Sequence, residues 1–188
     1  MFRLLKILFP LFIFAFGQMA CQSKTENSDG KNTGPSAAEQ KTQEAWNQSG
    51  EIVQKITLSP SHIIRNVDWG QSIESIVEKL ELSENQPATG KSFTLYLDNS
   101  DLNFADITYI PDAKNQVKEI DVDVFLEEND QVLELIERFQ TYLNAKIGPS
   151  KTEGKKILWG PKQNTQVTLE DVSTAKDPGI KLIFKQVP

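Results

Sequence analysis

The segment that decides the fold class covers residues 117–147 and reads VKEIDVDVFLEENDQVLELIERFQTYLNAKI. Its first part, residues 117–126, alternates aliphatic and acidic side chains, which is typical of a strand with one buried face. Its second part, residues 130–147, repeats apolar side chains every three or four positions, which predicts an amphipathic helix. Asn129 or Asp130 is expected to cap the start of that helix.

Further strand-like segments lie on both sides of this pair. Before it, residues 91–97 alternate, and residues 102–110 change parity near Ala105, which predicts a bulge there. After it, runs of apolar residues separated by Gly-Pro and Pro-Gly turns predict three more strands. These strands are expected at residues 155–159, 165–172 and 180–187.

An earlier helix is predicted to start at Asp68 or Ser72, and residues 51–58 are predicted to form a short first strand. The apolar side chains of that helix share one face at helical spacing: Ile73, Ile76, Val77 and Leu80. The repeating part of the order is therefore α-βββ-α-βββ. We expect an α+β fold in which two helices pack on one face of a mainly antiparallel sheet, within a single domain at residues 51–188.

The first 20 residues differ from the rest, because two basic residues precede an apolar run from Ile7 to Phe16. This pattern predicts a secretory signal peptide. With Ala20 directly before Cys21, the segment resembles a bacterial lipoprotein signal. The resemblance implies that the Cys21 thiol receives a diacylglyceryl group and becomes the mature N-terminus. An ordinary signal peptide cut after Ala20 would instead leave a free thiol. The implied location is the bacterial cell envelope, with the outer membrane favoured over the inner by Gln22.

Residues 21–50 are predicted to join the lipidated Cys21 to the domain as a flexible linker. Between residues 22 and 49 there is no Val, Ile, Leu, Phe or Met, so little apolar surface is available to offset the entropy of ordering. Only residues 37–46 have fair helix propensity, sufficient for a turn or two.

The composition excludes several classes of site. The chain has 188 residues, with 20 basic and 26 acidic side chains, and its net charge of −6 argues against nucleic-acid binding. A single Cys excludes an intrachain disulfide and a Cys-based metal centre, and a single His excludes a multi-His centre. We expect neither a cofactor nor a metal.

Residues 69–77, WGQSIESIV, are similar to a helix start in small bacterial envelope lipoproteins of the SmpA/OmlA group and their beta-lactamase-inhibitor-like relatives. The resemblance implies helices paired with an antiparallel sheet and an envelope binding or assembly module. It transfers no functional residue to this chain.

Two features of the sequence are candidates for a chemical site: an acidic strand face that could bind a cation, and a histidine that could act as a general base. Glu119, Asp121 and Asp123 line one face of a predicted strand, where alternate side chains stand about 6.5–7 Å apart, too far to close on one cation unaided. A solvated strand face is the favoured interpretation. His62 is a possible general base, but the sequence supplies no acid partner or nucleophile motif around it, so a loop histidine is favoured.

Four aromatic residues form a weak candidate platform for a ligand or partner: Trp69, Trp159, Tyr96 and Tyr109. For the two tryptophans, each of which precedes a Gly, core filling at the start of a helix or strand is the favoured interpretation. Exposure of Tyr96 and Tyr109 would strengthen the platform interpretation.

The leading functional hypothesis is a non-catalytic envelope lipoprotein, held to the membrane by its lipid, whose domain binds a protein or envelope partner. The alternatives are a small-ligand carrier and, less favoured, a hydrolase of envelope polymers. A binding module predicts an exposed apolar patch, and a carrier predicts an enclosed apolar pocket of about 300–1,000 Å³. A hydrolase predicts two carboxylates about 5–10 Å apart in a cleft.

Overall fold

A computed structural model describes residues 34–188, which form one compact unit. The predicted signal peptide at residues 1–20, the lipidation site Cys21 and the linker as far as residue 33 lie outside the described residues. Within the described residues, no helix is long and apolar enough to cross a membrane.

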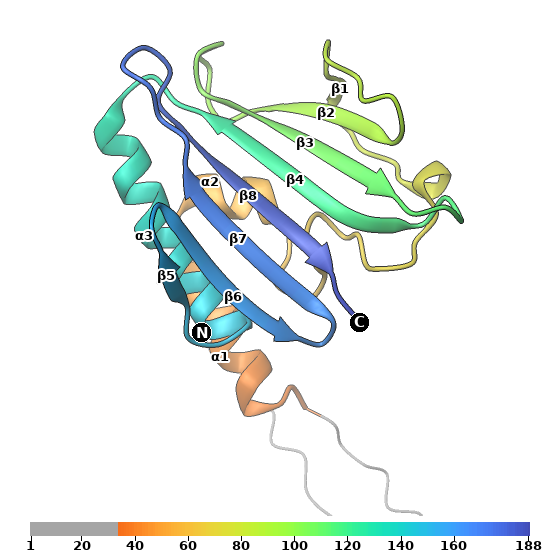
Figure 1. The fold of residues 1–188 in the computed structure, drawn as a ribbon. Coiled ribbons are helices and arrows are strands. Elements are labelled where there is room, and N and C mark those ends of the chain that lie inside the picture. The colour runs from red at the N-terminus through yellow and green to blue at the C-terminus, as the bar shows by residue number, and fades with distance from the viewer. Residues whose placement is uncertain (1–33) are drawn as a thin grey trace, which may run out of the picture. The chain divides into compact units, whose positions relative to one another are not determined.

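One eight-stranded sheet has the order β1-β2-β3-β4-β8-β7-β6-β5, and every pair of neighbours is antiparallel. Two four-stranded meanders therefore meet where β4 pairs with β8 (Figure 1). The strand bounds are β1 Glu81–Leu82, β2 Lys91–Tyr96, β3 Phe104–Pro111, β4 Val117–Phe125, β5 Lys151–Glu153, β6 Lys156–Lys162, β7 Thr165–Asp171 and β8 Gly179–Gln186.

The helices α1 (Ala37–Gln48), α2 (Glu51–Thr57) and α3 (Asn129–Lys146) lie behind the sheet in Figure 1. The core lies between them and the inner face of the sheet, where Ile107, Ile120 and Leu182 are fully buried. From α3, Leu135 and Phe139 fill the same core. The α+β fold class, with helices packed on an antiparallel sheet, is confirmed.

Residues 51–58, predicted as a strand, instead form α2. Ile52 and Ile56 lie four residues apart, a spacing that fits both the two-residue period of a strand and the turn of a helix. The helix buries Val53 and Ile56 together, and Glu51 pairs with Lys55 one turn away at 2.7 Å. The apolar spacing in residues 51–58 that predicted a strand is therefore the apolar face of a helix.

The helix predicted from residue 68 or 72 to residue 80 is also wrong, since only Ile73–Ser75 forms one 3₁₀ turn, η1. Apart from short i to i+3 hydrogen bonds within the segment, its backbone bonds to the β3–β4 turn and the start of β4. The Ile73 N–H donates to the Asn115 carbonyl at 3.1 Å, and the Gln71 carbonyl accepts from the Val117 N–H at 2.9 Å. Ile73 and Ile76 are buried, whereas Val77 is 88% exposed, so the predicted stripe does not form one face.

The prediction of a flexible linker at residues 21–50 is wrong for residues 37–48, which form α1. A capping box starts this helix, because Ser36 and Glu39 each accept the other's backbone N–H. The face that includes Thr42 and Trp46 packs toward α3, and the Thr42 hydroxyl donates to the Ala145 carbonyl at 3.3 Å. Small side chains and one Trp supply the contact that aliphatic residues usually provide.

Smaller corrections concern strand details. The irregularity of β3 lies between Ile110 and Pro111, not near Ala105. Glu128, not Asn129 or Asp130, caps α3, through a capping box with Gln131. The predicted turn at residues 160–162 belongs to β6, and β1 and β5 were not predicted.

Candidate functional site

The outer face of the sheet carries the most distinctive surface among the described residues. In the strand register, Tyr96 pairs with Phe104 and Phe104 pairs with Phe125. Phe125 pairs in turn with Gly179, to whose carbonyl the Val172 N–H donates at 3.1 Å. We call the row of Tyr96, Phe104, Phe125 and Val172 the aromatic strip. It runs from β2 through β3 and β4 and past Gly179 of β8 to the residue that follows β7, across neighbouring strands about 4.8 Å apart.

The aromatic strip is open to solvent. Tyr96 is 46% exposed, Phe125 37% and Val172 43%, and the adjacent Leu102 in the β2–β3 turn is 57% exposed. The rings of Phe104 and Phe125 stack with centroids 4.7 Å apart and planes 24° from parallel. Four of the eight exposed large apolar side chains in residues 34–188 thus lie at one end of the sheet. Of the other four, Leu58 and Val77 line a cavity beside the loop after α2.

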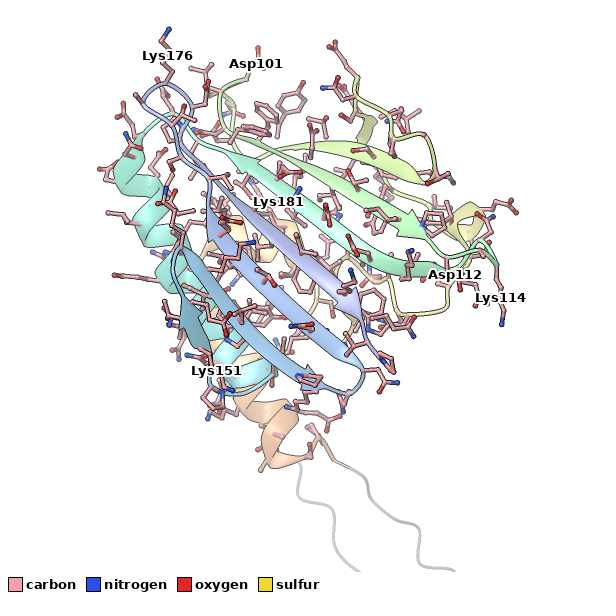
Figure 2. The ribbon with its side chains drawn as sticks, viewed as in Figure 1. Asp101, Asp112, Lys114, Lys151, Lys176 and Lys181 are labelled. Atoms are coloured by element: carbon pink, nitrogen blue, oxygen red, sulfur yellow. The ribbon has the colours of Figure 1, made fainter. Side chains whose placement is uncertain are left out.

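Exposed carboxylates surround this end of the sheet, and we call them the acidic rim: Asp98, Asp101, Glu127, Glu128 and Asp177. Hydrogen bonds hold their loops together, since the Glu127 N–H donates to Asn103 Oδ1 at 2.8 Å, and Asn103 Nδ2 donates to Asp98 Oδ2 at 2.7 Å. The Asn103 hydrogen bond lowers the pKa of Asp98, which keeps that carboxyl ionised. Figure 2 labels Asp101 and Lys176 at this end.

Two lysines of β8 pair with the three carboxylates of the acidic strand face. Lys181, labelled in Figure 2, points out from the sheet, and its Nζ lies 3.1 Å from Asp121 Oδ2 and 3.0 Å from Asp123 Oδ1. Lys185 lies 3.1 Å from Glu119. Burial raises the pKa of Asp121, and Lys181 opposes that effect. Within residues 34–188, no three His, Cys, Asp or Glu side chains are placed to hold a metal ion. These carboxylates therefore serve cross-strand ion pairs.

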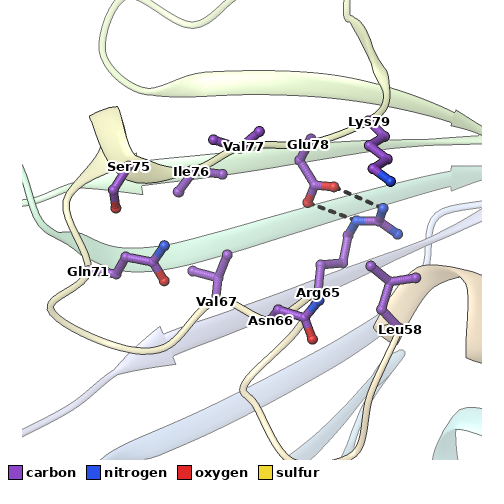
Figure 3. A pocket seen from close by; sticks show the side chains of 10 residues that line it. All are labelled: Leu58, Arg65, Asn66, Val67, Gln71, Ser75, Ile76, Val77, Glu78 and Lys79. Carbon is purple, nitrogen blue, oxygen red and sulfur yellow. Dashed lines mark hydrogen bonds and ion pairs between the residues drawn. The ribbon is translucent and has the colours of Figure 1, made fainter.

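A half-open cavity of about 470 Å³ lies between the loop after α2 and the segment after η1 (Figure 3). Its wall contains a buried ion pair, in which Arg65 Nε and Nη2 each lie 2.9 Å from a carboxylate oxygen of Glu78. Arg65 Nη1 donates to the Lys55 carbonyl, and Tyr109 donates to Glu78 Oε1. Both charged groups are thus already engaged by the protein.

A second buried cation lies at the end of α3. Lys146 Nζ donates to the carbonyls of His62 and Ile63 and to the Tyr142 hydroxyl. Burial lowers the pKa of Lys146 to about 8, and the nearby Asp68 opposes that shift. His62 itself pairs with Asp68 at 2.7 Å on the surface. This cluster joins the loop after α2 to α3.

The four predicted platform residues do not form one surface. Trp159 is buried and donates to Asn144 Oδ1 at 2.9 Å, and Trp69 is half-buried and donates to Thr165 Oγ1 at 2.9 Å. Tyr109 is fully buried on the inner face. Of the four, Tyr96 alone is exposed and belongs to the aromatic strip. Trp159 fills the core and Trp69 packs against it, as the favoured interpretation predicted.

The other members of the aromatic strip were missed, although the sequence contains a signal for one of them. Phe125 stands at an outward position of the strand at residues 117–126, where the preceding outward residues are acidic. An aromatic residue on a polar face was therefore visible. Its pairing with Phe104 depends on the β3–β4 register, which the sequence does not give.

Comparisons of the chain with protein-family models, with curated proteins and with solved structures give no significant match.

Proposed function

We propose that this chain is a lipid-anchored protein of the bacterial cell envelope whose domain binds a protein partner through the aromatic strip. The observation that carries the binding proposal is the gathering of four exposed apolar side chains at one end of the outer sheet face. The lipoprotein-like signal that ends at Cys21 supports the anchoring proposal.

The physical argument for binding is that the aromatic strip gains most when another surface covers it. Aromatic side chains carry a large share of the energy of protein interfaces, because they bury much area with little loss of rotamer freedom. The strip is held by paired strands, so little ordering is needed on binding. A flat row of this kind fits a protein surface better than it fits an enclosed small molecule.

The carrier alternative has less support. The cavity beside Arg65 has a volume of about 470 Å³, which lies in the expected range, but it is half-open and its wall holds a charged pair. Carrier pockets are mostly apolar and enclose their ligand. The hydrolase alternative would require free carboxylates, whereas Asp121 and Asp123 share Lys181.

Intact-protein mass spectrometry of the membrane fraction tests the anchor, on wild type and Cys21→Ser. We expect a wild-type chain that starts at Cys21 and carries acyl mass, and an unacylated Cys21→Ser chain. A wild-type chain with an unmodified Cys21 thiol would contradict the anchoring proposal and leave partner binding to be judged separately.

Site-specific photo-crosslinking in intact cells tests partner binding. A photoreactive phenylalanine analogue replaces Tyr96 in the aromatic strip or, as a matched control, Leu133, an apolar side chain of α3 that is 62% exposed. We expect a discrete protein adduct from position 96 and none from position 133. An adduct only from position 133, or from neither position, would count against the aromatic strip as the binding surface.

A further inference from the structure

We infer that the partner surface seated on the aromatic strip is basic, a protein segment in which Lys or Arg alternates with apolar residues. This inference rests on the proposed function and adds the chemistry of the partner. Its basis is the charge of the residues around the aromatic strip. The apolar side chains of the strip do not by themselves indicate the charge of the partner.

The loops beside the aromatic strip carry a strong excess of negative charge. The acidic rim supplies five exposed carboxylates, against two cations: Lys176 in the same loops, and Lys55 of α2, whose Nζ donates to the Leu97 carbonyl beside Asp98 at 2.7 Å. On the other side of the strip, Asp106 pairs in register with Asp123 in the next outward row of β3 and β4, and Lys181 of β8 pairs with Asp123 at 3.0 Å, so Asp106 carries the unbalanced charge of that row. The Thr94 hydroxyl donates to Asp106 Oδ1 at 2.6 Å, a contact that leaves the negative charge in place.

The aromatic strip and the acidic rim together form an apolar surface with an acidic border, which complements a partner surface that is both apolar and basic. Apolar side chains of the partner would cover the stacked rings of Phe104 and Phe125, while its cations would reach the acidic rim. Arg and Lys also gain from contact with aromatic faces, and Arg can bind a carboxylate through two parallel hydrogen bonds. Apolar contact and charge attraction thus favour the same kind of partner.

The same charges argue against other occupants. A second copy of this chain, docked strip to strip, would bring two acidic rims together, and like charges across an interface are unfavourable. An anionic lipid surface would meet the same repulsion. A basic protein segment is the occupant for which the rim contributes attraction.

The first experiment measures binding of two synthetic 12-residue peptides to the purified full-length protein. One peptide alternates Lys with Leu and Phe, and the other has Glu in place of every Lys. We expect saturable binding of the Lys peptide alone, weakened about tenfold or more when salt is raised from about 50 to 500 mM. Equal or tighter binding of the Glu peptide would overturn the inference.

A matched pair of double variants separates the acidic rim from the net charge of the protein. Asp101→Lys with Glu127→Lys reverses two rim charges, and Glu44→Lys with Glu137→Lys reverses two exposed charges on α1 and α3. We expect the rim variant to weaken binding of the Lys peptide about tenfold and the control variant less than about threefold. Equal effects would assign the binding to net charge and overturn the inference.

Two strip variants distinguish the inference from the proposed function. Phe125→Ser and Tyr96→Ser are both expected to weaken binding of the Lys peptide by more than about tenfold, since a handful of aromatic residues dominates most interfaces. Loss of binding in both strip variants with no change in the rim variant would overturn the basic partner and leave partner binding standing. No change in either strip variant, together with no crosslink from position 96, would overturn both proposals.

Discussion

Arg65 and Glu78 form a doubly hydrogen-bonded ion pair in the interior, with both contacts at 2.9 Å and both side chains almost fully buried. The Tyr109 hydroxyl donates to the same carboxylate. Tyr109 belongs to β3, whereas Arg65 and Glu78 lie in the long irregular segment between α2 and β1. The pair therefore attaches a segment without regular secondary structure to the inner face of the sheet.

Removal of one member of this pair is predicted to destabilise the domain strongly. Arg65→Met leaves the Glu78 carboxylate buried without its cation, which should lower the free energy of unfolding by about 3–5 kcal/mol in urea titrations. The double variant Arg65→Met with Glu78→Leu should regain much of that loss. Lys156→Met, which removes an exposed pair at 3.5 Å, serves as the control and should change stability by less than about 1 kcal/mol. A loss below 1 kcal/mol for Arg65→Met would contradict the structural role of the pair.

Lys146 predicts an unusual dependence of stability on pH. Its pKa in the folded protein is about 8, below the ordinary value of 10.5, so the unfolded chain binds more protons between these values. The free energy of unfolding should therefore rise with pH between about 8 and 10.5, and by about 2 kcal/mol from pH 8 to pH 10. Urea titrations at several pH values measure this slope, and Lys146→Met should remove it. An identical slope in the variant would refute the assignment.

Above that window the sign reverses. Burial raises the pKa of both Tyr109 and Tyr142 above the ordinary value for tyrosine. The folded protein then keeps protons that the unfolded chain loses, so stability should fall as the pH rises beyond about 10. The free energy of unfolding, measured in steps from pH 9 to pH 11, should therefore pass through a maximum between these two values.

Trp46 tests whether α1 belongs to the domain. Its indole Nε1 donates to Thr57 Oγ1 at 2.8 Å, and its ring packs against the core from outside the predicted domain boundary. Trp46→Ala should lower the free energy of unfolding by about 2 kcal/mol, less than for a fully buried Trp because the ring is partly exposed. The exposed Gln48→Ala on the same helix is the control. A change within 0.5 kcal/mol for Trp46→Ala, as for a surface residue, would restore the linker interpretation.

Lys181 opposes the effect of burial on the pKa of Asp121. Burial raises the pKa of Asp121, and the attraction of Lys181 limits that rise. Lys181→Met should therefore raise the pKa of Asp121 further, as followed by the carboxyl carbon shift in an NMR titration. Lys185→Met, which removes the partner of Glu119 instead, should have a smaller effect on Asp121. A lower Asp121 pKa in Lys181→Met would contradict this relationship.

The sequence predicts the elements that have one unambiguous period. The strand at residues 117–126 and the helix at residues 130–147 correspond closely to β4 and α3, because their apolar positions fit one period and exclude the other. Ile52 and Ile56 satisfy both periods, so α2 was mistaken for a strand. Residues 68–80 show a helical stripe, but hydrogen bonds to the β3–β4 turn, distant in sequence, prevent the helix.

The candidate site was less predictable than the fold. Tyr96 was singled out, but its neighbours Phe104 and Phe125 come from two other strands and are brought together only by the register. The residue type also does not indicate whether an aromatic side chain is buried or exposed. Tyr109 lies on the inner face and Tyr96 on the outer, a difference decided by the register and parity of each strand.

The measurement that tests partner binding most directly is the yield of the position-96 crosslink in a protein that also carries Phe125→Ser. Val77→Ser is the matched control, because Val77 is 88% exposed and lies beside the cavity, not in the aromatic strip. Partner binding through the strip predicts that Phe125→Ser removes most of the adduct while Val77→Ser leaves its yield unchanged. An adduct of equal yield in both variants would contradict binding through the aromatic strip.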